Sequence, residues 1–296
     1  MSSAVRFRRG TPADSRRAFD LSIAAVSELM ARQNQPTTDG DAFWKVLQPY
    51  ISHLAEHAAE WWLAEDPSDG SLVGHARSVE RGGLFELSEL FVRPGFQTKG
   101  LGKQLIERAF PNGRGDVRVI IATNDVRALA RYYAAGTVAR FSMATLSGAP
   151  KPAPRCELEV VSAQLDDVAV FAELEKAVVG YPRDADYPWL FRQREALLYR
   201  RHGHAVGFAF FSKTGLGPIA ALEPADQRSI LVDLENRAHA SAIDEMSLSV
   251  PTVNDIAMNH LFGRGFKIDG ALQFFMSSRP FGNFDRFIAF APPIVL

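Results

Sequence analysis

Hydrophobic and polar positions alternate along the chain in patterns that predict short strands and helices. Residues 84–92 (LFELSELFV) favour a strand, and Pro94 and Gly95 end that run. Residues 103–110 then carry apolar side chains at the spacing of one helix face. We therefore predict a strand, a glycine-containing turn and a helix at this point of the chain.

The same patterns predict the elements on either side of this stretch. Before it we expect a strand at residues 5–8, a helix through residues 21–29, a possible second helix at 43–50, and a hairpin of strands 61–65 and 72–79. After it we expect a strand at 117–122, a helix at 124–135 and a strand at 138–146. The predicted order is β–α–(α)–β–β–β–α–β–α–β.

The predicted turn has the chemistry of an anion site. Gly100 and Gly102 leave backbone N–H groups uncovered at a helix start, and Lys99 and Lys103 add positive charge. A Walker loop is excluded because it needs Gly-Lys-Ser/Thr. A dinucleotide fingerprint is excluded because Leu105 stands where a third glycine is required. The expected ligand part is a phosphate or a pyrophosphate.

The residues around this turn match one known pattern. Val92-Arg93-Pro94 ends the strand, and the six residues from Gln97 to Gly102 fit Gln/Arg-x-x-Gly-x-Gly/Ala. This resembles the acetyl-CoA pyrophosphate loop of the GNAT superfamily of N-acyltransferases. A later segment, with Asn124 at a helix start and Tyr132 four residues before a glycine, is similar to a second motif of the family. Thr137 stands where that motif has phenylalanine.

The second half of the chain echoes the first, which predicts a tandem protein. The Pro-rich stretch SGAPKPAPR is suited to a connector, so we predict domains at residues 1–147 and 156–296 with a linker at 148–155. The fold expected from the resemblance is α+β, with two tandem GNAT-like domains, each a mixed, mostly antiparallel sheet flanked by helices. In the second copy, residues 222–230 contain no glycine and Leu261 takes the tyrosine position. Only the first domain is therefore expected to hold the cofactor.

The resemblance implies acetyl-CoA as co-substrate and assigns its contacts. The pantetheine arm is expected to bond the backbone near the strand end, and the turn is expected to hold the diphosphate. Asn124 either bonds the cofactor or caps its helix. The predicted cofactor-binding residues are Leu90, Phe91, Val92, Gln97, Thr98, Lys99, Gly100, Leu101, Gly102, Lys103 and Asn124.

Acetyl transfer also needs a base and an acid. Glu86 and Glu89 are the candidate bases, and their odd spacing predicts that they lie on opposite faces of the strand. We favour Glu89 because it is nearer the strand end. Tyr132 is the acid implied by the resemblance, and the adjacent Tyr133 is the alternative. The resemblance implies that the early helices can flank the acceptor pocket, but a simple core or cover role is favoured for them.

Composition limits the function classes. The 296 residues are 47% hydrophobic and 23% charged with a net charge of −1, which indicates a globular protein with no general attraction to nucleic acid or membrane. A single cysteine, Cys156, and no long apolar run predict a cytoplasmic protein without a membrane span. His53 and His57 lack the glutamate of a His-Glu-x-x-His motif, so no metal is expected.

The sequence thus predicts an N-acetyltransferase acting on a small-molecule or protein amine, as a monomer or homodimer. The first alternative is a non-catalytic acyl-CoA-binding protein of the same fold. A purely structural scaffold is a third possibility, and it predicts no binding of coenzyme A.

Overall fold

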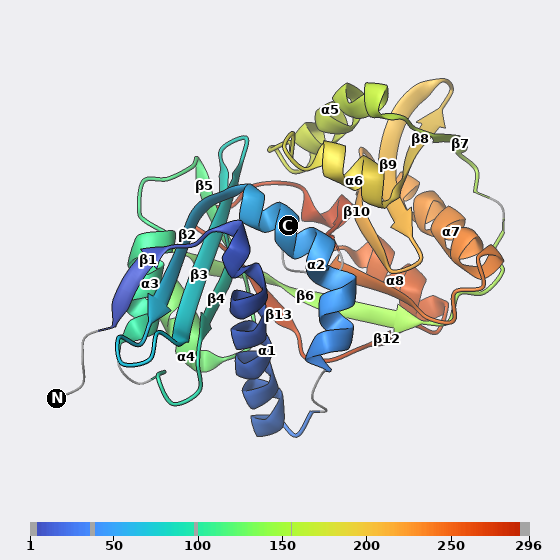
Figure 1. The fold of residues 1–296 in the computed structure, drawn as a ribbon. Helices are drawn as coiled ribbons and strands as arrows, with labels where there is room; N and C mark the ends of the chain where they lie inside the picture. The colour runs from blue at the N-terminus through green and yellow to red at the C-terminus, as the bar shows by residue number, and fades with distance from the viewer. Residues whose placement is uncertain (1–4, 36–38, 98–99, 155, 291–296) are drawn as a thin grey trace. The chain divides into compact units, whose positions relative to one another are not determined.

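The computed structural model describes residues 5–35, 39–97, 100–154 and 156–290 (Figure 1). The chain divides into two compact units. The first takes the chain up to Ile120 together with Asp125–Thr137, and the second takes Ile121–Asn124 and the chain from Val138 onward.

The first unit is a sheet with helices on both faces. Its strands β1 to β5 lie in chain order; β1 to β4 pair antiparallel and β4 pairs with β5 in parallel. The elements are β1 (Arg6–Arg9), α1 (Ser15–Arg32), α2 (Gly40–Glu56), β2 (Ala58–Glu65), β3 (Leu72–Arg81), β4 (Leu84–Val92), α3 (Leu101–Ala109), β5 (Val117–Ala122) and α4 (Val126–Ala134). This is the predicted order, including the β2–β3 hairpin.

Side-chain alternation on β3 decides which helices cover which face. Ser78 donates a hydrogen bond to the Ala109 carbonyl at 2.6 Å, which places α3 on one face. His75 is an odd number of residues from Ser78, so its side chain lies on the other face of β3. There it bonds Ser22 of α1 at 2.8 Å, so α1 covers that face. Arg77 shares the face of His75 and donates to the Ile51 carbonyl of α2.

Strand β4 has two irregularities near its C-terminal end. Arg77 lies opposite Glu89, but Ser78 lies opposite Leu87, so Ser88 is an extra residue that forms a β-bulge. The pairing of β4 with β5 ends at Leu87. From Ser88 onward, β4 therefore has no strand partner on its β5 side within the described parts of the chain.

The second unit contains two sets of strands. Its elements are β6 (Val138–Gly148), β7 (Glu159–Ser162), α5 (Val168–Val178), α6 (Tyr187–Gln193), β8 (Glu195–Arg201), β9 (His204–Ser212), β10 (Gly215–Ala221), α7 (Pro224–Ala240), β11 (Met246–Pro251), α8 (Asp255–Gly263), β12 (Lys267–Ile268), β13 (Gln273–Ser277) and β14 (Phe287–Ile288). One sheet has the order β14-β10-β9-β8-β7. The other set is built on β6, which pairs with β11, β12 and β13.

Alternation along β9 anchors helices on both faces of its sheet. Phe208 and Phe210 contact Phe171 of α5, with ring centroids 5.0 and 5.3 Å apart. Ala209 and Phe211 instead join a core that includes Ile230 and Leu234 of α7. The apolar residues of β9 are therefore buried on both sides.

The division between the units falls at Thr137, earlier than the expected boundary at residue 147. The reason is that β6, which we assigned to the first domain, pairs with three strands from the second half of the chain. Hydropathy gives the strand but not its partners.

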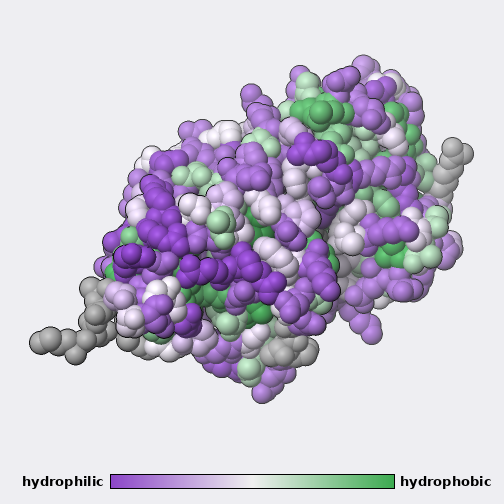
Figure 2. All heavy atoms as spheres, viewed as in Figure 1, coloured by the Kyte–Doolittle hydropathy of each residue, from purple (hydrophilic) through white to green (hydrophobic). Residues whose placement is uncertain are grey.

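The surface in view is mostly hydrophilic, with small separate apolar areas (Figure 2). None of the helices in the described ranges is both long and apolar enough to cross a membrane.

Candidate functional site

The predicted anion turn follows β4 directly. Gly100 has a φ of +72° and occupies the N-cap of α3, where it has no side chain to accept from the first N–H groups of the helix. The helix begins at Leu101, two residues before the predicted start. Thr98 and Lys99, both predicted to bind cofactor, lie outside the described residues.

Gly102 differs from Gly100 because the fold does not require it to be glycine. A Cβ built there meets nothing closer than the Arg131 guanidinium at 3.5 Å, which is ordinary van der Waals contact. Its φ is outside the left-handed region, and alanine would favour the helix by about 1 kcal/mol. A bare backbone in the first turn of α3 therefore serves something other than packing.

The other predicted residues of the turn have different surroundings. Leu101 is 2% exposed and packs towards Gly74 of β3, so only its backbone is available to a ligand. Lys103 has an exposed side chain that lies 3.8 Å from Glu107. Both arrangements are compatible with a diphosphate held mainly by backbone N–H groups.

Gln97 turns its side chain towards protein groups. Its amide nitrogen donates to Val92 O at 3.3 Å and to Glu28 at 3.2 Å, and its oxygen accepts from Arg127 at 2.8 Å. Arg127 in turn bonds Asp125. Gln97 therefore ties the turn to α1 and α4, which is a positioning role rather than direct contact with a ligand.

Asp125, not Asn124, caps α4. The Asp125 carboxylate accepts from the Arg127 backbone N–H at 3.0 Å, and its pKa is lowered by the hydrogen bond from the Arg127 side chain, against some burial. Arg32 of α1 adds a bond at 3.4 Å. Asn124 lies in the segment between β5 and α4, so of its two predicted roles the capping role belongs to its neighbour.

Tyr132 is buried in α4, with 7% of its surface exposed, whereas Tyr133 is exposed. Burial, with a contribution from Asp125, raises the pKa of Tyr132, so the phenol keeps its proton. Within the described residues, no group hydrogen-bonds to its hydroxyl. This phenol can therefore act as a proton donor.

Glu86 and Glu89 lie on the same face of β4, and the prediction of opposite faces was wrong. Glu86 is opposite Val79 and Glu89 is opposite Arg77, and those two positions of β3 share a face. The bulge at Ser88 inserts one residue between the glutamates and so restores their phase. Both are buried, at 1% and 5% exposed, on the face covered by α1 and α2.

The predicted pantetheine contacts, Leu90, Phe91 and Val92, lie on the part of β4 that has no β5 partner. All three are half-buried. No described strand pairs with this side of β4, and addition of an extended chain as a strand is a recurrent binding mode for an unpaired sheet edge.

Two arginines near these groups were not predicted. Arg131 is a residue of α4, and its guanidinium lies beside the first turn of α3. No described residue pairs with it. Arg77 is fully buried and bonds Glu89. In the sequence, Arg77 and Arg131 are marked only as basic residues within amphipathic segments.

The corresponding place in the second unit has different chemistry. Strand β10 is followed by α7 with Pro224 at its first turn, and Glu223 at the N-cap. Asp226, in the first turn, is ion-paired with Arg201, and Leu261 is 1% exposed in the core. The start of α7 therefore has the carboxylates of Glu223 and Asp226, and Pro224 has no N–H to donate, whereas the start of α3 has bare amides. This chemistry disfavours a phosphate at α7.

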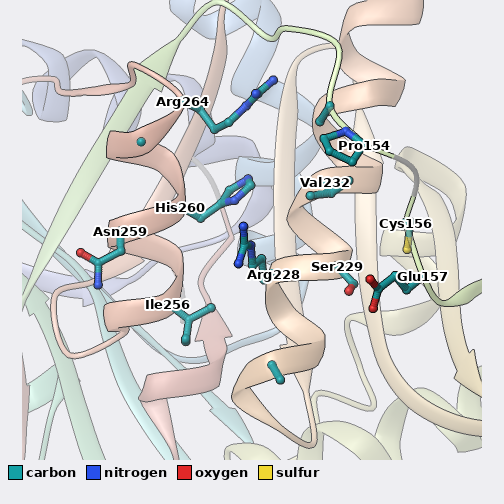
Figure 3. Close-up of a pocket in the computed structure, with 13 residues that line it drawn as sticks. Pro154, Cys156, Glu157, Arg228, Ser229, Val232, Ile256, Asn259, His260 and Arg264 are labelled. Atoms are coloured by element: carbon teal, nitrogen blue, oxygen red, sulfur yellow. The ribbon is translucent and has the colours of Figure 1, made fainter.

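A pocket of about 920 Å³ lies between α7 and α8 of the second unit (Figure 3). Its basic residue Arg264 pairs with Glu235 and donates to the carbonyls of Lys151 and Pro152 at 3.0 and 2.8 Å. The His260 ring points into the gap between the helices, and burial lowers its pKa. These bonds fix the Pro-rich connector to α7 and α8.

A separate question is whether metal ligands gather anywhere. Within the described ranges, no three His, Cys, Asp or Glu side chains are arranged to hold a metal ion. His53 and His57 contact each other, with ring centroids 4.3 Å apart, and the Nδ1 atom of His57 bonds the His53 carbonyl.

Comparison with known proteins finds one matching family model. Residues 23–136, which include the turn and α4, match the model of the acetyltransferase (GNAT) family. This part of the chain is therefore similar to the GNAT acetyltransferases, the family that its sequence resembles. No curated protein matches the sequence.

Solved structures match the chain over nearly its whole length. A candidate acetyltransferase from Pyrococcus horikoshii has 17% identity and a TM-score of 0.74, covering 96% of this chain and 93% of its own. A GCN5-related N-acetyltransferase from Sphaerobacter thermophilus has 18% identity and a TM-score of 0.63, covering 93% and 96%.

A tandem GNAT protein from the clavulanic acid biosynthesis pathway has 15% identity and a TM-score of 0.56, covering 94% of this chain and 99% of its own. At these identities the likeness concerns the fold. The predicted α+β tandem GNAT architecture is confirmed.

Proposed function

We propose that this chain is an N-acetyltransferase that moves the acetyl group of acetyl-CoA to a primary amine of a small molecule or a protein. The observation that carries the proposal is the first turn of α3. There Gly100 has a left-handed backbone and Gly102 is bare without a packing reason, directly after a strand with an open edge. This arrangement fits a pyrophosphate followed by an extended arm.

Residues of the first unit would hold the cofactor in three places. The N–H groups of Gly100, Leu101 and Gly102 would face the diphosphate, and Arg131 beside them supplies a positive charge. The backbone of Leu90 to Val92 would pair with the pantetheine amides. Gln97 would keep the turn in place through Val92 and Arg127.

Acetyl-CoA supplies the activated acyl group, and the chain supplies the proton transfers. Glu89 takes a proton from the acceptor ammonium, which frees the nitrogen lone pair to attack the thioester carbon. The C–S bond then breaks, and Tyr132 gives its proton to the departing thiolate. The buried position of Tyr132, with no hydrogen-bond partner for its hydroxyl among the described residues, supports this role.

Calorimetry with acetyl-CoA, followed by a thiol-release assay over a panel of amines, tests the proposal. We expect saturable binding and release of thiol with at least one amine. Tyr132→Phe should bind acetyl-CoA normally and turn over about 10²-fold more slowly or worse, as expected for a lost general acid. Equal turnover in that variant would remove Tyr132 from the mechanism.

The burial of Glu89 against Arg77 favours one alternative, an acyl-CoA-binding protein that does not transfer the group. A carboxylate engaged by a guanidinium is partly occupied as a proton acceptor. Tight binding of acetyl-CoA with no thiol release on any amine would support this alternative. No binding at all would contradict both functions.

A further inference from the structure

Arg77 and Glu89 form an ion pair inside the first unit. They face each other across β3 and β4, and the Arg77 Nε atom donates to Glu89 Oε2 at 2.5 Å. Arg77 is 0% exposed and Glu89 is 5% exposed. The pair is therefore shielded from solvent, where a bond between opposite charges is strong and geometrically defined.

Three further contacts fix the arginine. Its guanidinium lies 4.4 Å from the centroid of the Trp61 ring and donates to the Ile51 carbonyl. The hydroxyl of Ser88, the bulge residue, donates to the Arg77 carbonyl at 3.1 Å. With the guanidinium held from several sides, the carboxylate that it binds has one preferred orientation.

This orientation leaves one carboxylate oxygen available. The Nε and Nη2 atoms of Arg77 both contact Oε2 of Glu89, and no group in the described ranges bonds to Oε1. Glu89 also lies on the face of β4 that α1 and α2 cover.

We propose that Arg77 is a positioning residue: it holds Glu89 by Oε2 so that Oε1 accepts the proton of the acceptor ammonium. The inference rests on the proposed function. Arg77 touches neither the acetyl group nor the amine, and it acts on the reaction through Glu89 alone. The proton passes from the ammonium nitrogen to Oε1, and the nitrogen lone pair forms the new bond to the acetyl carbon. The C–S bond of the thioester then breaks, the thiolate takes a proton from Tyr132, and the acetylated nitrogen loses its remaining extra proton, which restores the phenol.

The same two strands provide a matched control. Arg81 and Glu86 form a second ion pair on the same face, with an Nη1–Oε2 distance of 3.6 Å, and they are 6% and 1% exposed. This pair lies before the bulge, where β4 still pairs with β5. Its loss should disturb the fold as the loss of Arg77 does, without removing a contact of Glu89, the favoured base.

The experiment compares Arg77→Met, Glu89→Gln and the double variant in the full chain, with kcat and acetyl-CoA affinity measured separately. Each single change should lower kcat about 10²-fold and leave affinity unchanged. The double variant should lose no more than Glu89→Gln alone. Its melting temperature should recover relative to Arg77→Met, since it leaves no unpaired buried carboxylate.

Two more variants separate positioning from stability. Arg77→Lys keeps a cation near Oε2 and should restore part of kcat. Arg81→Met should lower the melting temperature while kcat stays within twofold of the wild type.

The inference is overturned if the double variant loses the product of the two single factors, or if Arg81→Met lowers kcat as strongly as Arg77→Met. If the wild-type chain acetylates an amine and Arg77→Met has the same kcat, the inference about Arg77 is overturned but the proposed function stands. A wild-type chain that binds acetyl-CoA and acetylates no amine overturns the proposed function with it.

Discussion

Gly100 and Gly102 are glycines for different physical reasons, and only a substitution at Gly102 tests ligand binding without straining the backbone. Gly100 needs its left-handed φ of +72°, so any side chain there strains the backbone as well as the site. Gly102 has ordinary helical surroundings and room for a methyl group. A change at Gly102 can therefore separate ligand binding from folding.

Gly102→Leu, whose side chain is larger than the alanine that the matched pattern admits, should leave the folded chain about as stable as the wild type and weaken acetyl-CoA binding at least tenfold. The first effect follows from the better helix propensity of leucine than of glycine, and the second from a bulky side chain placed between the backbone N–H groups and the diphosphate. Urea unfolding and calorimetry measure the two effects on the same sample. Unchanged affinity with unchanged stability would contradict the assignment of the turn.

A second residue controls the response to acid. His75 is fully buried, and burial lowers its pKa to about 4, against an opposing effect of Glu89. Its Nε2 atom bonds Ser22. The unfolded chain takes up this proton near pH 6.5, and the folded chain only near pH 4. Between these values the unfolded state binds more protons, so stability rises with pH.

We therefore expect His75 to remove about 3 kcal/mol of unfolding free energy as the pH falls from 7 to 4. His75→Gln keeps a hydrogen-bonding group beside Ser22 but does not titrate. Urea unfolding at several pH values should give a smaller loss for this variant than for the wild type. Parallel curves for the two proteins would show that His75 does not cause the loss.

At the scale of elements, hydropathy predicted the strands and helices better than it predicted which strands pair and in which register. Strand β4 and helix α3 were found because their apolar spacing is local. The bulge at Ser88 could not be predicted, because it is defined by the register with β3. That one residue reversed the expected relation between Glu86 and Glu89. Arg77 was missed for the same reason, since it acts through Glu89 on the neighbouring strand, and Arg131 was missed because its position beside Gly102 depends on how α3 and α4 pack.

The start of α4 gives a testable consequence at this scale. Asp125 caps the helix that carries Tyr132 and also binds Arg127 and Arg32. Asp125→Ala should lower the unfolding free energy by about 1 to 2 kcal/mol, whereas Asp125→Asn keeps a cap acceptor and should recover about half of that loss. Chemical unfolding of both variants measures this. Equal losses would mean that the ion pairs, rather than the cap, stabilise the helix start.

For the whole molecule, the repeat in the sequence predicted two related halves, and the match in fold to a tandem GNAT protein agrees with this. The compact units divide at Thr137, because β6 pairs with strands that follow it by about 100 residues or more, whereas the sequence predicted a boundary at the Pro-rich connector. Long-range pairing is the information that local periodicity lacks. What each half does must therefore be judged from its own chemistry.

The two halves should differ in the number of acetyl-CoA molecules that they bind. The turn before α3 has bare amides, whereas the start of α7 has Pro224, Glu223 and an Asp226 carboxylate already paired with Arg201. Negative charge near a helix N-terminus opposes an anion by the same dipole effect that favours it at α3. We expect one acetyl-CoA per chain in calorimetry.

The same variants decide which half accounts for that one site. Gly102→Leu should abolish the heat of binding or shift it to much higher ligand concentration, whereas Glu223→Ala should leave it unchanged because removing one carboxylate restores no bare amide. A stoichiometry of two, with one site surviving in Gly102→Leu, would show that the second unit binds the nucleotide despite its carboxylates. Backbone exposure would then be less decisive for phosphate binding in this fold than the two helix starts indicate.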